Sequence, residues 1–214
     1  LEARACRFNV DYPEKYEKTI PLITEIDAMY KKSLPSQYAA QHKKSAETHF
    51  KIGQTSFTTV TTNVNFQTTL HKDAGDDADG FGNLTVISKG SYSGAETCFP
   101  QYGLGVDVQM GDMLFMNVHE WHGNLPMKKL GKKTDDVVRM SIVCYLRTRL
   151  WQRTRNLSKQ FMTNHLKKLK NMRSEASNGI RPQIKKNGKK TRNKTHQKKT
   201  RRKTAVQKTR KKRN

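Results

Sequence analysis

Residues 70–84 read LHKDAGDDADGFGNL, a loop that gathers one histidine and four aspartates in a chain otherwise rich in lysine and arginine. His71 and Asp73 stand two positions apart. On an extended segment, side chains at this spacing point to the same face, so an imidazole and a carboxylate could share one metal ion. The pattern therefore predicts part of a metal site at the edge of a β-structure, with a further ligand from another strand.

The three remaining aspartates of this loop are Asp76, Asp77 and Asp79. A helix–loop–helix calcium site does not fit, because aligning Gly80 with its invariant glycine puts Gly75 and Val86 where carboxylate ligands belong. Aspartate and glycine also favour solvated turns for backbone reasons. A solvated turn and a functional role both remain open for these three side chains.

Around this loop the sequence is rich in β-branched and aromatic residues that glycines interrupt. The pattern predicts strands over 57–66, 83–89, 95–99, 104–109, 112–118 and 137–147. Short strands at this spacing favour an all-β barrel or sandwich over alternating strands and helices. Apolar periodicity and basic composition predict helices over 11–32, 36–48 and 155–173. Asp11 is the expected N-cap of the first helix, and Pro21 is expected to kink or break it.

The formal net charge of +24 lies almost wholly in the C-terminal part of the chain. Residues 1–150 carry 18 basic and 17 acidic side chains, whereas residues 151–214 carry 24 basic ones and a single glutamate. After about residue 178 no apolar periodicity remains, so that segment cannot bury enough surface to fold alone. We expect a helical support region over 1–54, a β core over 55–150, a basic helix over 151–177 and a disordered basic tail over 178–214.

Cysteine usage and hydropathy narrow the class of protein. Cys6, Cys98 and Cys144 form no CxxC pair, which argues against disulfide partners and for a reducing, intracellular compartment. No apolar run approaches the length of a membrane span, so no membrane partner is expected. The chain does not begin with methionine, and we expect a fragment or trimmed form whose true N-terminus lies elsewhere.

Candidates for the missing ligand follow in GDMLFMNVHEWHGN, residues 111–124. His119 and His122 are three positions apart, so an extended chain would point them to opposite faces. Either could complete a metal site with the first histidine and aspartate.

A strand with two distinct faces is predicted at RMSIVCYLR, residues 139–147. One face carries Arg139, Ser141, Val143 and Tyr145, and the other carries Met140, Ile142, Cys144 and Leu146. A buried arginine needs an anion, because an unpaired buried charge is costly. The anion could be a carboxylate of the domain itself or a bound dicarboxylate held in a bidentate pair.

The blocks HKD, GFGNL, FPQYGLGVDVQMGDMLFMNVHEWHGN and RMSIVCYLR, in this order, resemble the TET/JBP branch of the 2-oxoglutarate- and Fe(II)-dependent dioxygenases. The resemblance covers about residues 55–150. It implies a mainly β protein with flanking helices, whose core is a double-stranded β-helix (a jelly roll of the cupin-like kind). It also implies hydroxylation of the 5-methyl group of thymine or 5-methylcytosine in DNA.

The resemblance also implies roles for the candidate residues. His71, Asp73 and His122 match the Fe(II) ligands, which leaves His119 as a neighbouring or core histidine. Arg139 matches the arginine that binds the far carboxylate of 2-oxoglutarate, with Ser141 beside it. Dioxygen would take the coordination position that the cosubstrate leaves open.

The expected partner is DNA, with the target base flipped out of the duplex. The positions that match substrate contacts are Tyr145, Asp76 and Asn83. Arg147 stands where some members have a histidine, which puts that contact in doubt. The basic tail would bind phosphates, and KKTRRK at 198–203 and KTRKKR at 208–213 would serve as nuclear targeting signals. A viral protein that acts in a host nucleus would fit the same pattern.

Two other functions remain open. A protein (prolyl or lysyl) hydroxylase of the same superfamily would use the same metal and cosubstrate residues. A non-enzymatic, basic nucleic-acid-binding protein would keep the barrel without its chemistry, although an intact set of ligands and Arg139 argues against this. The sequence indicates no oligomeric state.

Overall fold

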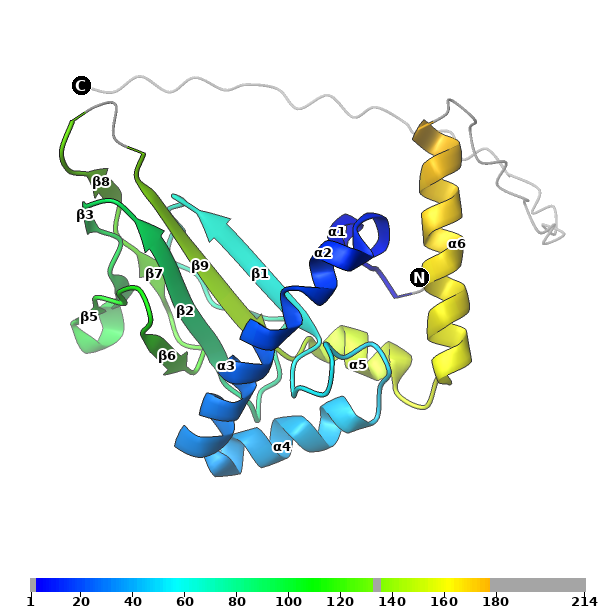
Figure 1. The fold of residues 1–214 in the computed structure, drawn as a ribbon. Helices are drawn as coiled ribbons and strands as arrows, with labels where there is room; N and C mark the ends of the chain where they lie inside the picture. The colour runs from blue at the N-terminus through cyan, green and yellow to red at the C-terminus, as the bar shows by residue number, and fades with distance from the viewer. Residues whose placement is uncertain (1–2, 133–135, 178–214) are drawn as a thin grey trace, which may run out of the picture.

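The computed structural model describes residues 3–132 and 136–177 (Figure 1). The helices are α1 (Arg7–Asp11), α2 (Pro13–Glu17), α3 (Ile20–Ser33), α4 (Pro35–Ala46), the 3-10 turn η1 (Pro100–Tyr102), α5 (Thr148–Thr154) and α6 (Lys159–Ser177). The strands are β1 (Thr59–Val64), β2 (Gly82–Lys89), β3 (Tyr92–Gly94), β4 (Thr97–Phe99), β5 (Leu104–Val106), β6 (Met113–Met116), β7 (Gly123–Asn124), β8 (Met127–Lys129) and β9 (Val138–Tyr145). Helices and strands are segregated, as in a sheet-rich protein with flanking helices.

The main sheet has the antiparallel order β1–β9–β2–β6. Its long central strand β9 lies between β1 and β2, with Ser141 opposite Asn63 on one side and Val86 on the other. The alternation predicted for this strand is confirmed. Met140, Ile142 and Cys144 pack into a helix-side core, whereas Arg139, Ser141, Val143 and Tyr145 line a cavity on the opposite face.

The helix-side core is built on α3, which crosses one face of the main sheet (Figure 1). The apolar stripe that predicted this helix supplies Ile23, Ile26 and Tyr30, all buried. The Tyr30 ring stacks on Phe57, and burial raises its pKa to about 12. Its hydroxyl accepts a hydrogen bond from the amide of Phe81 at 3.0 Å, so the helix fixes the loop that leads into β2.

A second core lies on the cavity side of the main sheet. It is formed by Leu84, Val86, Phe99, Val108, Met116 and Val118. These residues connect the main sheet to a smaller sheet of order β5–β4–β7, while β3 pairs with β8. The short strands β3, β7 and β8 were not predicted.

Two helical predictions are wrong in detail. Asp11 ends α1 instead of capping the next helix, because the chain turns at Tyr12 and α2 begins at Pro13. The single basic helix expected over 155–173 is preceded by a separate helix, α5, and a break that contains Asn156 with a positive φ of 68°. Pro21 lies in the first turn of α3, where proline is tolerated, so the expected break falls just before it.

In the described part of the chain, no helix is long and apolar enough to cross a membrane. The cysteines are free, and Cys144 is fully buried in the helix-side core. The predicted disordered tail, 178–214, lies outside the described residues.

Candidate active site

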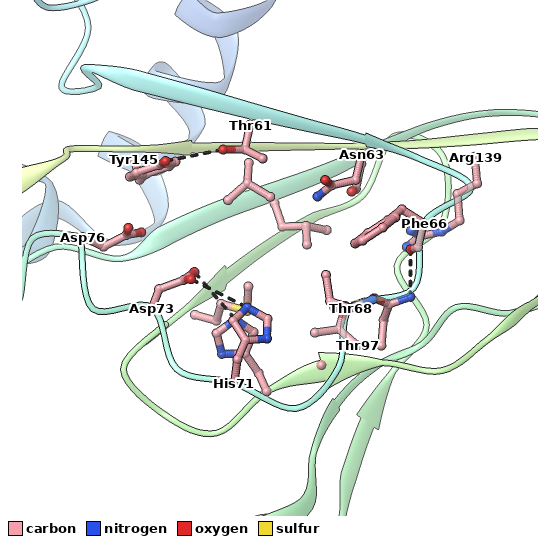
Figure 2. Close-up of a pocket in the computed structure, with 17 residues that line it drawn as sticks. Thr61, Asn63, Phe66, Thr68, His71, Asp73, Asp76, Thr97, Arg139 and Tyr145 are labelled. Carbon is pink, nitrogen blue, oxygen red and sulfur yellow. Dashed lines mark hydrogen bonds and ion pairs between the residues drawn. The ribbon is translucent and has the colours of Figure 1, made fainter. Parts of the chain in front are cut away.

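A cavity of about 260 Å³ lies between the main sheet and the smaller sheet (Figure 2). Its lining comes from segments far apart in the sequence. These are Thr61 and Asn63 of β1, then Phe66, Thr68, His71, Asp73 and Asp76 of the following loop, Leu84, Thr97, Met116, the segment His122 to Asn124, and the alternating residues of β9. The cavity therefore collects the HKD loop, the WHGN segment and the arginine strand at one place.

His71 and His122 face each other across a closed pair of backbone hydrogen bonds. The amide of each residue donates to the carbonyl of the other at 2.9 Å. A directly opposed pair on antiparallel segments projects both side chains to one side. The ring centroids accordingly lie 4.4 Å apart. The amide of Asp73 continues the pairing by donating to the carbonyl of Val118 at 2.9 Å.

The two ring nitrogens of each histidine have different partners. Nδ1 of His71 lies 2.7 Å from the carbonyl oxygen of Thr69, and Nδ1 of His122 lies 2.8 Å from that of Glu120. A carbonyl can only accept, so these contacts assign a proton to each Nδ1, and the neutral ring then leaves the lone pair of Nε2 for a metal ion. Both Nε2 atoms face the Asp73 carboxylate, at 3.6 Å and 3.8 Å. Figure 2 shows Asp73 directed toward His71.

His71, Asp73 and His122 thus offer three ligand atoms that lie within 4.8 Å of one another. His119 does not belong to this cluster. It lies in the turn after β6, where its amide bonds to the Asn117 side chain and its Nε2 is buried without a hydrogen-bond partner among the described residues. The chain turns between β6 and β7, so the extended geometry assumed for His119 and His122 does not hold at this position.

Arg139 enters the cavity from β9 and is only 8% exposed. Its amide donates to the Asn65 side chain at 2.7 Å, but its Nε is buried without a partner. Among the residues that the structure describes, no carboxylate pairs with its guanidinium. Of the two anions that the sequence left open, the described residues supply no carboxylate for this arginine, which favours a bound dicarboxylate. Ser141 is also buried and lines the same cavity.

The aspartates of the acidic loop have two different roles. Lys44 of α4 pairs with Asp77 at 2.5 Å and with Asp79 at 2.6 Å, so these two carboxylates attach the loop to the helices. Asp76 instead lines the cavity. Burial and the nearby charge of Asp73 raise the pKa of Asp76 to about 7, against an opposing effect of Arg147.

The two other candidates for substrate contact have different positions. Tyr145 lines the cavity beside Asp76 in Figure 2, with its hydroxyl 3.4 Å from that of Thr61. The prediction for Asn83 is wrong. Asn83 lies opposite Cys144, is fully buried, and donates to the carbonyl of Phe81 at 2.8 Å, whereas its neighbour Leu84 faces the cavity.

Sequence reasoning missed Asn124, which lies in the WHGN block but was given no role. Its side-chain oxygen accepts bonds from the amide and the hydroxyl of Thr68 at 2.7 Å and 2.5 Å. Asn63 and Phe66 also line the cavity and were not predicted. The β-strand alternation of residues 57–66 was a signal for the first of these, but none pointed to the second.

Two histidines and one carboxylate on one side of a cavity, with space for further ligands, define a non-haem iron oxygenase type of centre. Arg139, which pairs with no carboxylate among the described residues, provides an anion site beside these ligands. The family comparison agrees: residues 1–148 match the Tet_JBP model, the oxygenase domain of the 2-oxoglutarate- and Fe(II)-dependent dioxygenase superfamily. The chain belongs to this family. The superfamily uses Fe(II), 2-oxoglutarate and dioxygen, and the donor set of this cavity fits them.

Several relatives share this region. Thymine dioxygenase JBP1-A of Trypanosoma cruzi is 32% identical over 150 residues, which cover 70% of this chain and 18% of that protein. The bifunctional helicase and thymine dioxygenase JBP2 of the same organism is 30% identical over 152 residues, 68% of this chain and 14% of that protein. The chain therefore spans less than a fifth of the length of these relatives.

The fold is shared with a solved structure of NgTET1 in complex with 5mC DNA. The TM-score is 0.55, and the match covers 77% of this chain and 63% of the other at 12% identity. A likeness at this identity is one of fold.

Proposed function

We propose that the protein is a 2-oxoglutarate- and Fe(II)-dependent dioxygenase that hydroxylates the 5-methyl group of a pyrimidine base, thymine or 5-methylcytosine, in DNA. The observation that carries the proposal is the cluster of His71, Asp73 and His122 in the same cavity as the buried Arg139, which pairs with no carboxylate among the described residues. The metal ligands and the arginine together match the two ends of a chelating dicarboxylate. Neither feature alone would indicate such a ligand.

In this proposal each side chain has a defined task. The Nε2 atoms of the two histidines and the Asp73 carboxylate hold Fe(II), and the bonds of the Nδ1 atoms to backbone carbonyls keep the rings oriented. Arg139 binds the far carboxylate of 2-oxoglutarate in a bidentate pair, with Ser141 beside it. When bound, the iron and its cosubstrate supply the oxidation of an unactivated C–H bond. The protein holds the cosubstrate and target in line and excludes water.

DNA is the proposed substrate because the similar proteins are named thymine dioxygenases and the neighbour in fold was solved with 5mC DNA. A methyl group inside a duplex cannot reach a buried metal, so the base must be flipped out. Tyr145 and Asp76 line the cavity at the end away from Arg139 (Figure 2) and are proposed to receive the base, the first by stacking. A protein hydroxylase would use the same metal and cosubstrate residues, but nothing in the cavity favours it.

The proposal extends to the organisation of the chain. We take the facing sheets, β1–β9–β2–β6 and β5–β4–β7, as the two halves of a double-stranded β-helix over residues 55–150. The helices over 1–54 would support it, and 151–177 would form a basic helical extension. The basic segment 178–214 would bind DNA phosphates and direct the protein to the nucleus.

The test is a reaction with two DNA substrates. The protein is incubated with Fe(II), 2-oxoglutarate and duplexes that contain either thymine alone or 5-methylcytosine, and the nucleosides are analysed by mass spectrometry. We expect a hydroxymethyl pyrimidine from one duplex, with an equal amount of succinate. Succinate without a modified nucleoside in either duplex would indicate another substrate, and neither product would refute the dioxygenase assignment. The Asp73→Ala protein is the control.

A further inference from the structure

The loop after β1 begins with a left-handed residue that is bonded to the arginine strand. Asn65 has a φ of 49°, a conformation that asparagine tolerates better than most residues. Its amide donates to the carbonyl of Arg139 at 2.9 Å, and its side-chain oxygen accepts from the amide of Arg139 at 2.7 Å. Its side-chain nitrogen donates to the carbonyl of Val137 at 3.2 Å. These bonds turn the chain sharply at the point where Arg139 enters the cavity.

The same loop is also held at its other end. The amide and the hydroxyl of Thr68 both donate to the side-chain oxygen of Asn124, and the amide of Asn124 donates back to the carbonyl of Thr68 at 3.3 Å. The side-chain nitrogen of Asn124 donates to the carbonyl of Phe66 at 3.3 Å. The backbone is therefore fixed on both sides of Phe66. Asn65 is bonded to the arginine strand β9, and Thr68 is bonded to Asn124 beside the metal cluster.

Phe66 is 61% exposed, yet its ring lines the cavity. In Figure 2 it lies at the Arg139 end, away from Tyr145 and Asp76. We propose that Phe66 is a positioning residue that covers the far carboxylate of bound 2-oxoglutarate and shields its ion pair with Arg139 from water. This inference rests on the proposed function and adds a residue that neither the metal cluster nor the arginine accounts for.

The physical reason is the dependence of an ion pair on its surroundings. A carboxylate and a guanidinium attract each other far more strongly where water is excluded than where it has access. An aromatic ring at the rim adds apolar contact to the methylene groups of the ligand and removes water from the pair. Because the main chain on either side of Phe66 is already fixed by hydrogen bonds, little backbone ordering remains when the ligand binds.

The experiment measures cosubstrate binding, not turnover. Calorimetry with Mn(II), which occupies the metal site without supporting the reaction, gives the dissociation constants of 2-oxoglutarate and of 2-oxobutyrate. The second compound keeps the keto acid end and lacks the far carboxylate. The variants are Phe66→Ala, Phe66→Leu and Phe66→Gln. Val64→Ala is the matched control, because Val64 is an exposed apolar residue of β1 that does not line the cavity.

For Phe66→Ala we expect 2-oxoglutarate to bind roughly tenfold more weakly, the loss that follows when about 50 Å² of apolar cover is removed. The affinity for 2-oxobutyrate should change much less, and the affinity for Mn(II) alone should not change. Phe66→Leu should restore most of the loss. Phe66→Gln should not, because an amide of similar size brings water to the pair.

Three results would overturn the inference. Unchanged 2-oxoglutarate binding in Phe66→Ala would mean that the ring does not cover the carboxylate. Equal losses for both keto acids would place its effect at the metal end, and recovery by Phe66→Gln would show that bulk alone matters. Failure of the unmodified protein to bind 2-oxoglutarate would instead refute the proposed function.

Discussion

Replacing Arg139 with methionine should make the ligand-free protein more stable while it abolishes cosubstrate binding. Arg139 is 8% exposed, its Nε has no partner, and no carboxylate among the described residues neutralises its guanidinium. A fully buried unpaired cation costs several kcal/mol, but the adjoining cavity admits water, so we expect Arg139→Met to gain only about 1–2 kcal/mol. Methionine keeps the backbone bond to Asn65, so the strand itself is left unchanged.

The effect of ligand has the opposite sign. With Mn(II) present, 2-oxoglutarate at one hundred times its dissociation constant should stabilise the unmodified protein by about 2.7 kcal/mol. The same concentration should leave Arg139→Met unaffected, since the anion site is gone. Urea unfolding followed by circular dichroism, with and without ligand, measures both effects. Arg149→Met is the control, because Arg149 is exposed on α5.

A loss of about 1 kcal/mol or more in ligand-free Arg139→Met would refute the reasoning, since most buried-site losses of that size reflect broken favourable contacts. It would mean that the arginine is neutralised within the protein. Stabilisation of the variant by 2-oxoglutarate would separately show that the anion binds elsewhere.

Three further predictions concern the ligands, Asp76 and the tail. Asp73→Ala should abolish turnover, and His122→Ala should lose metal affinity far more than His119→Ala; equal affinities by calorimetry would reverse the choice of histidine. The raised pKa of Asp76, about 7, means that the folded state holds this proton more tightly than the unfolded chain, so its effect lowers stability as pH rises from about 4 to about 7. Asp76→Asn should therefore stabilise metal-free protein at pH 8 and much less at pH 5 in urea unfolding, and an equal gain at both would contradict the shift. Removing 179–214, which holds 17 basic residues, should flatten the dependence of log K on log salt by about 0.9 for each lost phosphate contact in a fluorescence titration with duplex DNA. An unchanged slope would assign the affinity to the folded part.

The parts of the site that obey a simple period could be predicted from the sequence. The two faces of β9 follow from strand alternation, and the spacing of His71 and Asp73 follows from the same rule. These features are local, and burial on one face forces them. The long apolar stripe of α3 could also be predicted from the sequence, because its period is that of a helix.

The features that were not predicted correctly depend on residues that are distant in the sequence. Asn83 looked like a polar candidate, but it is fully buried and its side-chain nitrogen donates to the carbonyl of Phe81, which no sequence pattern reveals. The strands β7 and β8 are too short for a period and exist only because β4 and β3 lie beside them. The placement of Phe66 rests on side-chain bonds to residues from two other segments, so only the folded chain shows it.

The amides of His71 and His122 are bonded to each other's carbonyls, so the two imidazoles meet only after distant segments have closed on one another. Closing such a loop costs chain entropy, and contacts of this kind form late in folding. A metal ion that bridges both side chains would act as a removable cross-link that favours the closed chain, much as a disulfide does. Unlike a disulfide, this link needs no oxidising compartment. The supply of the ion would then govern how long each molecule survives unfolding and proteolysis, as well as whether it can react.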